Sequence, residues 1–146
     1  MKKENSIMVK ENENMEVSLF ESENNKFYCS VNAESEEEKK KLFNALESCD
    51  VLLNDCVGQE IEIKDIYVEQ RQVIDDETGE VKEKYRTILF DKSGQTYATG
   101  SYGIYNVIKK LLRIYGLPTF WETPLKVKVT KRPLGNGKQS LTLTLV

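Results

Sequence analysis

The sequence predicts a mainly β protein in which five strands and one helix follow each other in the order β-β-β-α-β-β. Short runs in which apolar and polar residues alternate are typical of half-buried strands. Between the third and fourth of these runs, the apolar spacing changes to that of an amphipathic helix. A chain of 146 residues, of which 39% are hydrophobic, suffices for one compact core. We therefore expect a single domain over residues 15–146, with an N-terminal extension over 15–56 and the core sheet over 57–146.

The N-terminal extension is expected to be a hairpin and a helix. Residues 1–14 are polar and lack any period, which predicts a disordered terminus. Residues 15–31 alternate on both sides of a polar turn, which predicts a β-hairpin. Ser35 and Glu38 have the spacing of a capping box, so we expect a helix over 35–48. The residues that this helix is expected to bury are Leu42, Phe43, Ala45 and Leu46.

The first strand of the core sheet is expected to be long and bent. Ile61 and Ile63 share one face, whereas Ile66 and Val68 share a face of the opposite parity. A slip of one residue inside a strand is typical of a β-bulge, which bends the strand. Curved strands are needed in small barrels. The acidic segment 75–80 then predicts a turn.

The rest of the chain supplies four more strands and the helix. Strands are expected at 82–91 and 95–99, around a turn at 91–94, and again at 125–130 and 141–145, around a loop at 131–138. The helix between the two pairs has the apolar stripe Ile104, Val107, Ile108, Leu111, Leu112 and Tyr115 and is ended by Gly116 and Pro118.

This element order is that of an OB-fold. The OB-fold is a five-stranded, partly open barrel that binds oligonucleotides on the face of its second and third strands and between two of its loops. Element order does not prove that a barrel closes, so an α+β sandwich with the same order stays open as an alternative.

Charge is distributed unevenly along the chain. Residues 1–81 contain 9 Lys and Arg against 21 Asp and Glu, whereas residues 82–146 contain 12 against 3. Solvated surfaces usually mix both signs. A basic half of this kind therefore indicates a polyanionic partner, of which nucleic acid is the commonest.

The candidate binding face lies on the second and third strands. Alternation places Lys84, Arg86, Ile88, Phe90 and Lys92 on one side of the second strand. A hairpin loop of two or four residues then places Tyr97 and Thr99 on that side, and Ala98 on the opposite side with Leu89. The first side combines cations, which neutralise phosphates, with rings on which bases stack. The small, apolar opposite side is expected to line the barrel.

The candidate nucleic-acid-binding residues extend from this face onto the neighbouring strands, the linkers and the last loop. They are Tyr67, Arg71, Lys84, Arg86, Phe90, Lys92, Tyr97, Tyr102, Tyr105, Trp121, Lys126, Lys128, Lys131, Arg132 and Lys138. Three alternatives stay open. Ile88 and Phe90 are core residues if the two faces are reversed. Trp121 either closes one end of the barrel or stacks on bases, and the two helix tyrosines either pack under the sheet or line the groove.

Composition argues against enzymes and metalloproteins. The chain has no histidine, which removes the commonest general base and metal ligand. Cys29, Cys49 and Cys56 fit neither a disulfide framework nor a zinc-ligand spacing. The glycine-rich segment 135–138 does not match a phosphate-binding loop. These observations predict a non-enzymatic protein without metal or cofactor. Because no apolar run is long enough for a membrane span or a signal peptide, we also expect the protein to be cytosolic.

Parts of the chain resemble a known family. The segments 87–98 (TILFDKSGQTYA), 125–129 (LKVKV) and 140–145 (SLTLTL), with the helix between them, are similar to single-stranded DNA-binding proteins. These proteins are encoded by small protein-primed tailed bacteriophages and by related mobile elements of Gram-positive bacteria. The resemblance covers roughly residues 55–146, with a weaker similarity at 43–45.

The resemblance implies a small non-enzymatic protein that coats single strands displaced during phage DNA replication, protecting them and preventing their re-pairing. It implies single-stranded DNA as the partner, no membrane, and the cytoplasm of the bacterial host as the location. Replication proteins and further copies of the chain stay open as partners. The residues alone also leave open an OB-like adaptor or inhibitor module that binds another protein.

Overall fold

The structure is a computed structural model of the chain and describes residues 25–146. The described residues form two compact units. The larger unit contains residues 28–68 and 85–146, and the smaller contains residues 25–27 and 69–84. The expected disorder at 1–14 and the first half of the expected hairpin lie outside the described residues.

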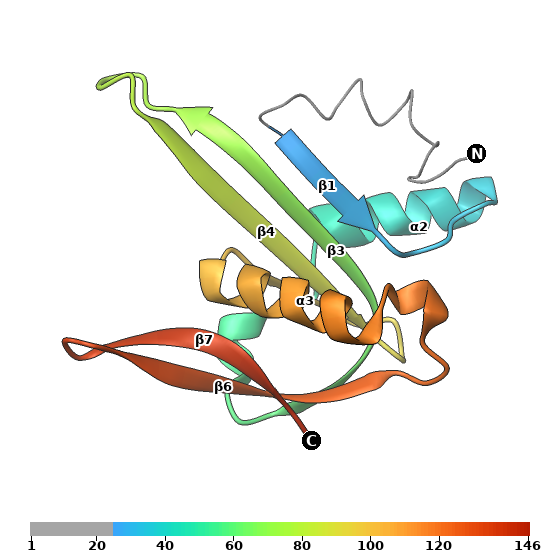
Figure 1. Cartoon of the computed structure of the whole chain (residues 1–146). Coiled ribbons are helices and arrows are strands. Elements are labelled where there is room, and N and C mark those ends of the chain that lie inside the picture. The colour runs from blue at the N-terminus through green and yellow to red at the C-terminus, as the bar shows by residue number, and fades with distance from the viewer. Residues whose placement is uncertain (1–24) are drawn as a thin grey trace. The chain divides into compact units, whose positions relative to one another are not determined.

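The described chain is mainly β, as expected, with 45% of residues in strands. The elements are β1 (Asn25–Cys29), α2 (Glu36–Glu47), β2 (Val51–Leu52), β3 (Glu60–Ile74), β4 (Val81–Asp91), β5 (Thr96–Thr99), α3 (Tyr102–Tyr115), β6 (Leu125–Gly135) and β7 (Lys138–Leu145) (Figure 1). Two short 3₁₀ helices, at Leu53–Cys56 and Pro118–Phe120, follow β2 and α3. None of the helices in this part of the chain is long and apolar enough to cross a membrane.

The strand order within the described sheet is β2-β5-β4-β3-β6-β7, and β1 also pairs with β3. In the larger unit, β3 pairs antiparallel with β6, so that Ile61 lies opposite Val127. The order is open, with β2 and β7 at its ends. Within the larger unit the sheet is curled into a half-barrel, and the closed five-stranded barrel of an OB-fold is not confirmed.

The capping box predicted for α2 is present. The Ser35 Oγ accepts a hydrogen bond from the Glu38 backbone N–H at 3.1 Å, and the Glu38 carboxylate accepts one from the Ser35 N–H at 3.0 Å. The backbone hydrogen bonds from Ser35 and Glu34 hold the pKa of Glu38 below its ordinary value. The expected burial of Phe43 is wrong, because its side chain is 64% exposed. This helix packs against Ile88, Phe90 and Ala98 of β4 and β5 through its half-buried side chains Leu42, Ala45 and Leu46.

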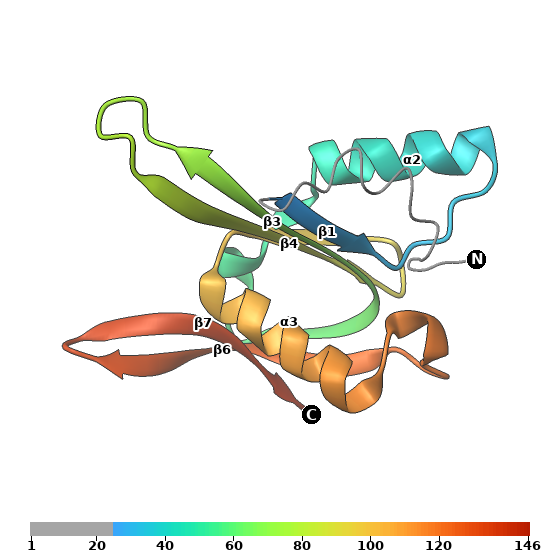
Figure 2. The same cartoon turned by 45° about the horizontal axis from the view of Figure 1, so that its top comes forward.

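The apolar stripe predicted for α3 faces the core except at its last residue, Tyr115, which is 45% exposed. Ile104, Ile108 and Leu111 are buried. The Ser101 Oγ caps the helix by accepting a hydrogen bond from the Ile104 N–H at 3.2 Å. Gly116 ends the helix at φ 80°, in the left-handed region that favours glycine. In Figures 1 and 2, α3 lies between the β6–β7 hairpin and the part of β3 and β4 that belongs to the larger unit.

The change of parity predicted inside β3 is confirmed by burial. Ile61, Ile63 and Ile66 are all buried and pack into one core, although Ile66 has the opposite parity to the first two. Beyond β3, that core contains Leu53, Cys56, Leu89, Tyr97, Ile104, Ile108, Leu111, Val127, Val129 and Leu141. The half-barrel is thus filled from both helical and sheet elements.

The last hairpin is longer than expected. The sequence predicts a loop over 131–138, but β6 and β7 pair as far as Gly135 opposite Lys138. Asn136 and Gly137 form the turn with φ of 54° and 74°, as in the tight Asn-Gly hairpin turn. Pro133 is accommodated at a register shift between Pro133 and Gly135, a position where a missing N–H is tolerated. Lys131 and Arg132 are consequently strand residues.

A short strand in the link between α2 and β3 has no counterpart in the predictions. β2 pairs parallel with β5, with Val51 opposite Tyr97. Next to it, Asp50 accepts hydrogen bonds from the backbone N–H and the hydroxyl of Thr96 at 2.9 and 3.2 Å, and its own N–H donates to the Thr96 Oγ. These bonds fix the end of α2 to the start of β5.

Candidate nucleic-acid interface

The predicted pairing of β4 with β5 is wrong by one residue. Leu89 lies opposite Tyr97, and Ile88 lies opposite Ala98. Residues directly opposite each other share a face, so Tyr97 points to the main core and not to the side of Phe90. The physical reason is the loop. The Asp91 N–H donates to the Gln95 carbonyl, which leaves three residues in the turn and not two or four, and Gly94 takes the positive φ that such a loop requires.

The predicted binding face of β4 and β5 is covered by α2. Ile88, Phe90 and Ala98 form a second core cluster, against which Leu42 and Leu46 pack. Phe90 is only 8% exposed, so the alternative in which Ile88 and Phe90 are core residues is the one that the structure shows. Tyr67 is half-buried against the same cluster.

Arg86 binds the end of the covering helix. Its Nη2 donates to the Leu46 carbonyl at 3.1 Å and lies 3.7 Å from the Cys49 Sγ. The last turn of α2 contains no basic residue of its own, and a cation near a helix C-terminus is stabilising. The structure therefore gives Arg86 a partner inside the protein.

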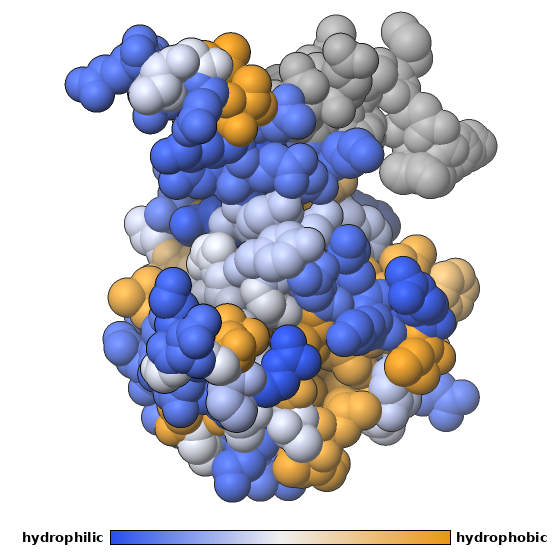
Figure 3. Space-filling model, turned by 60° about the vertical axis from the view of Figure 1, so that its left-hand side comes forward, coloured by the Kyte–Doolittle hydropathy of each residue, from blue (hydrophilic) through white to orange (hydrophobic). Residues whose placement is uncertain are grey.

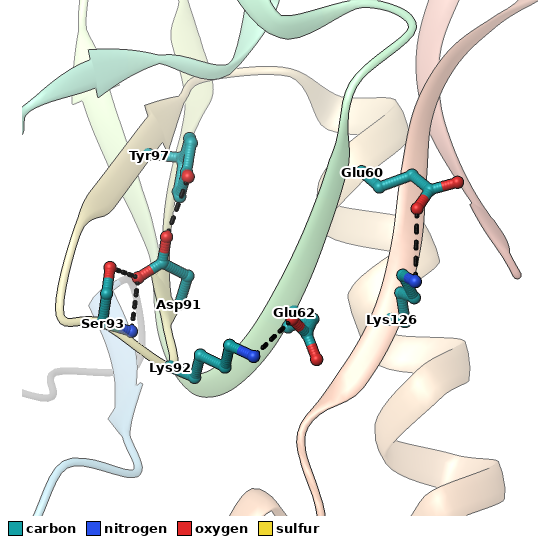
Figure 4. Close-up of polar contacts among 7 residues, drawn as sticks. All are labelled: Glu60, Glu62, Asp91, Lys92, Ser93, Tyr97 and Lys126. Carbon is teal, nitrogen blue, oxygen red and sulfur yellow. Dashed lines mark hydrogen bonds and ion pairs between the residues drawn. The ribbon is translucent and has the colours of Figure 1, made fainter.

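Two other predicted cations, Lys92 and Lys126, face carboxylates of β3. The Lys92 Nζ lies 2.9 Å from Glu62, and the Lys126 Nζ lies 3.4 Å from Glu60 (Figure 4). The hydrogen bond to Glu62 raises the pKa of Lys92. These four side chains line a shallow pocket of about 280 Å³ together with Ile61, Asp91, Ser93 and Tyr97. Because acids alternate with cations along this pocket, it offers phosphates no uniformly positive surface.

Tyr97 is part of the structure of that turn. Its ring is 8% exposed, and its hydroxyl donates to the Asp91 Oδ2 at 2.9 Å. Burial and the neighbouring Asp91 carboxylate raise the pKa of Tyr97 to about 12. The other Asp91 oxygen accepts hydrogen bonds from Ser93 and from the Gln95 N–H. The Tyr97 hydroxyl thus stabilises the β4–β5 turn through its hydrogen bond to Asp91.

A cluster of three tyrosines lies at the start of α3, within the larger unit. The ring centroids of Tyr85 and Tyr105 are 4.6 Å apart, and those of Tyr85 and Tyr102 are 5.0 Å apart. The rings of Tyr102 and Tyr105 are 6.4 Å apart and nearly parallel, with 25° between their planes. Tyr102 is 56% exposed, whereas the other two rings are half-buried. We call Tyr85, Tyr102 and Tyr105 the tyrosine cluster.

The basic part of the β6–β7 hairpin lies close to this cluster. A Cβ placed on Gly103, between the two helix tyrosines, would lie 2.8 Å from the Leu141 carbonyl oxygen, so α3 touches β7 there. Across the hairpin, Leu141 pairs with Lys131, and Ser140 pairs with Arg132. Neighbouring strands are about 4.8 Å apart, which places these two exposed cations within a side chain's reach of the cluster.

One face of the molecule is hydrophilic with scattered apolar residues. Figure 3 brings forward the side that is on the left in Figure 1, and its blue and pale areas are interrupted by separate orange ones. A surface of this composition suits a polar ligand better than a wide apolar partner.

The remaining predicted residues are placed as follows. Lys128 and Lys138 are exposed on the β6–β7 hairpin. Arg71 and Lys84 are exposed residues of the smaller unit. Trp121 is half-buried against the main core, its indole N–H donates to the Gly116 carbonyl at 2.9 Å, and it lines an open pocket of about 470 Å³. Its position fits the closing of one end of the core.

Sequence reasoning missed Tyr85 and Lys109. Alternation along the second strand places Tyr85 on the same side as Leu89, the side expected to line the barrel, and Lys109 lies outside the apolar stripe of the helix. The Lys109 Nζ lies 5.0 Å from the centroid of the Tyr105 ring, within the range of a cation–π contact. The sequence does contain a signal for the cluster. Tyr85 lies near the start of an otherwise small and apolar strand face, and Tyr102 and Tyr105 lie at the start of the next helix.

Comparison with known proteins gives one family match. The model of a family described as phage single-stranded DNA-binding protein matches residues 21–146. No curated protein and no solved structure matches the chain significantly. The family match spans most of the chain, including the extension that carries α2. The chain therefore belongs to the family of phage single-stranded DNA-binding proteins.

Proposed function

We propose that the protein, which as a member of this family binds single-stranded DNA in phage replication, does so on the tyrosine cluster and the adjoining basic residues Lys131, Arg132 and Lys138. Bases stack on Tyr102 and its neighbours, and the cations of the hairpin neutralise phosphates. Every base offers a ring face, so binding of this kind tolerates any sequence. The observation that carries the proposal is the closeness of three rings to an exposed cationic strand pair.

The protein acts by occupying the strand and catalyses no reaction. Coating excludes nucleases and the complementary strand, which is what a displaced strand needs. The site of action is the cytoplasm of the infected bacterium. Replication proteins and further copies of the chain are its proposed protein partners.

The test compares Tyr102→Ala with Tyr115→Ala, two exposed tyrosines of the same helix. Stacking is worth about 1 to 3 kcal/mol per base, so Tyr102→Ala should weaken binding to an unstructured labelled oligonucleotide roughly 5- to 150-fold. Tyr115 lies at the other end of α3, and its removal should leave the affinity unchanged. Fluorescence anisotropy titrations at two salt concentrations measure both.

Two results would contradict the proposal. Equal losses in the two variants would show that the cluster has no special role. A wild-type protein that does not bind single strands at low salt, or that binds duplex equally well, would contradict the mode of action itself.

A further inference from the structure

We propose that α3 itself carries the bound strand onward from the tyrosine cluster, with Lys109 and Arg113 as phosphate contacts. The inference rests on the proposed binding at the cluster. It extends the binding surface from the start of α3 along the rest of the helix, an element that the OB-fold description does not include among its ligand sites.

Four residues of α3, three of them exposed and one half-buried, form one continuous stripe. Tyr102, Tyr105, Lys109 and Arg113 are three or four residues apart, a spacing that places side chains on one helix face. The opposite face holds the buried Ile104, Ile108 and Leu111. Four residues of helix rise about 6 Å, so the stripe proceeds from rings to cations in steps of one helical turn.

The stripe joins the cluster directly. The Lys109 Nζ lies 5.0 Å from the Tyr105 ring centroid, so a phosphate next to a base stacked on the cluster is within reach of this ammonium group. Arg113 follows one turn later and is exposed. A guanidinium can bind phosphate through two N–H groups at once.

The cations of the stripe are free to bind phosphate. α3 contains no Asp or Glu over Tyr102–Tyr115. Among residues 25–146, Lys109 and Arg113 form no ion pair, whereas Lys92 and Lys126 both do. A cation without an acidic partner gives up no ion pair when it neutralises a phosphate.

Two other routes across the larger unit are less suitable. The outer face of β4 and β5 is covered by α2. The surface beside Lys92 carries Glu60, Glu62 and Asp91, which repel phosphates. The stripe on α3 avoids both.

The experiment measures how the affinity of the full chain for a labelled oligo-dT depends on salt. For single strands, the slope of log affinity against log salt is about 0.7 per neutralised phosphate. The double variant Lys109→Ala/Arg113→Ala should therefore have a slope smaller by about 1.4. Between 50 and 200 mM salt, the wild type should then lose about sevenfold more affinity than the variant.

The matched control is Lys39→Ala/Lys41→Ala on α2. It removes the same charge from exposed helix residues that also have no ion pair among the described residues. Its slope should equal that of the wild type. Circular dichroism melting and the single variant Lys109→Ala, with an expected slope smaller by about 0.7, guard against a folding defect in the double variant.

Three outcomes decide the matter. A reduced slope in the α3 variants alone supports the inference. Equal effects in both double variants show that only net charge matters, which overturns it. If the α3 variants keep the wild-type slope while Tyr102→Ala still weakens binding, the inference fails and the proposed function stands.

Discussion

The substitution Tyr97→Phe distinguishes a structural tyrosine from a DNA-binding one. It removes a single hydroxyl, which donates to the Asp91 carboxylate at 2.9 Å from a ring that is 8% exposed. The shape of the side chain is otherwise unchanged, so the core keeps its packing. We expect a less stable protein with unchanged affinity for single strands.

The size of the effect follows from the hydrogen bond. A bond to a charged group contributes about 1.5 to 3 kcal/mol. Asp91 is half-buried and keeps its bonds from Ser93 and Gln95, so a loss of about 1 to 2 kcal/mol is expected, at and just below the lower end of that range. For a domain of this size, 1 kcal/mol lowers the melting temperature by roughly 4 °C, which gives a fall of about 4 to 8 °C.

Urea unfolding and thermal melting, followed by circular dichroism, measure the change. The matched control is Tyr115→Phe, at a ring that is 45% exposed, where a change within about 0.5 kcal/mol is expected. The affinity of each variant for oligo-dT is measured on the same preparations. If Tyr97→Phe melts like the wild type but binds single strands several-fold more weakly, the placement of Tyr97 in the core has no consequence and the assignment of faces is refuted.

Three further predictions follow from the same contacts. Arg86→Ala should lower the unfolding free energy measured in urea by about 1 kcal/mol, because the Leu46 carbonyl loses its donor, and the affinity for oligo-dT should stay constant. A loss of affinity without a loss of stability would support the predicted role of Arg86 as a DNA contact. Gly103→Ala should lower the melting temperature, because its Cβ would lie 2.8 Å from the Leu141 backbone oxygen and overpacking costs about 1 to 3 kcal/mol; wild-type melting would show that α3 and β7 separate freely. Burial raises the pKa of Asp91, but the hydrogen bonds from Ser93, Tyr97 and Gln95 outweigh it and hold the pKa below its ordinary value. The stabilisation by the Asp91 carboxylate is therefore present above the ordinary pKa of about 3.9 and is lost as pH falls through the folded-state pKa. The difference in unfolding free energy between wild type and Asp91→Asn should shrink on acidification below about pH 4. A difference that grows on acidification would contradict this prediction.

Local signals in the sequence were sufficient for most elements. The capping box of Ser35 and Glu38, the stripe of α3 and the change of parity in β3 each depend on residues a few positions apart, and all three are present in the structure. The fold class could therefore be predicted. Whether the sheet closes into a barrel could not be predicted, because closure depends on which edge strands meet, and such pairing has no local signal.

The faces of β4 and β5 could not be predicted because parity depends on loop length. The segment 91–95 is compatible with loops of two, three or four residues, and one residue of difference exchanges every side chain between the faces. The tyrosine cluster is equally non-local, since Tyr85 lies on a strand and Tyr102 lies on the next helix, 17 positions later. Only the packing of α3 under the sheet brings their rings together.

The cover that α2 forms over Ile88, Phe90 and Ala98 has a consequence for anyone who shortens the protein. A version that begins after Cys49 would expose Ile88 and Phe90, two large apolar side chains in the middle of the sheet. Surfaces of this kind promote self-association. A truncated protein should therefore aggregate or precipitate even if every DNA contact is intact. A loss of DNA binding in such a preparation would result from aggregation and would not show that the binding site had been removed.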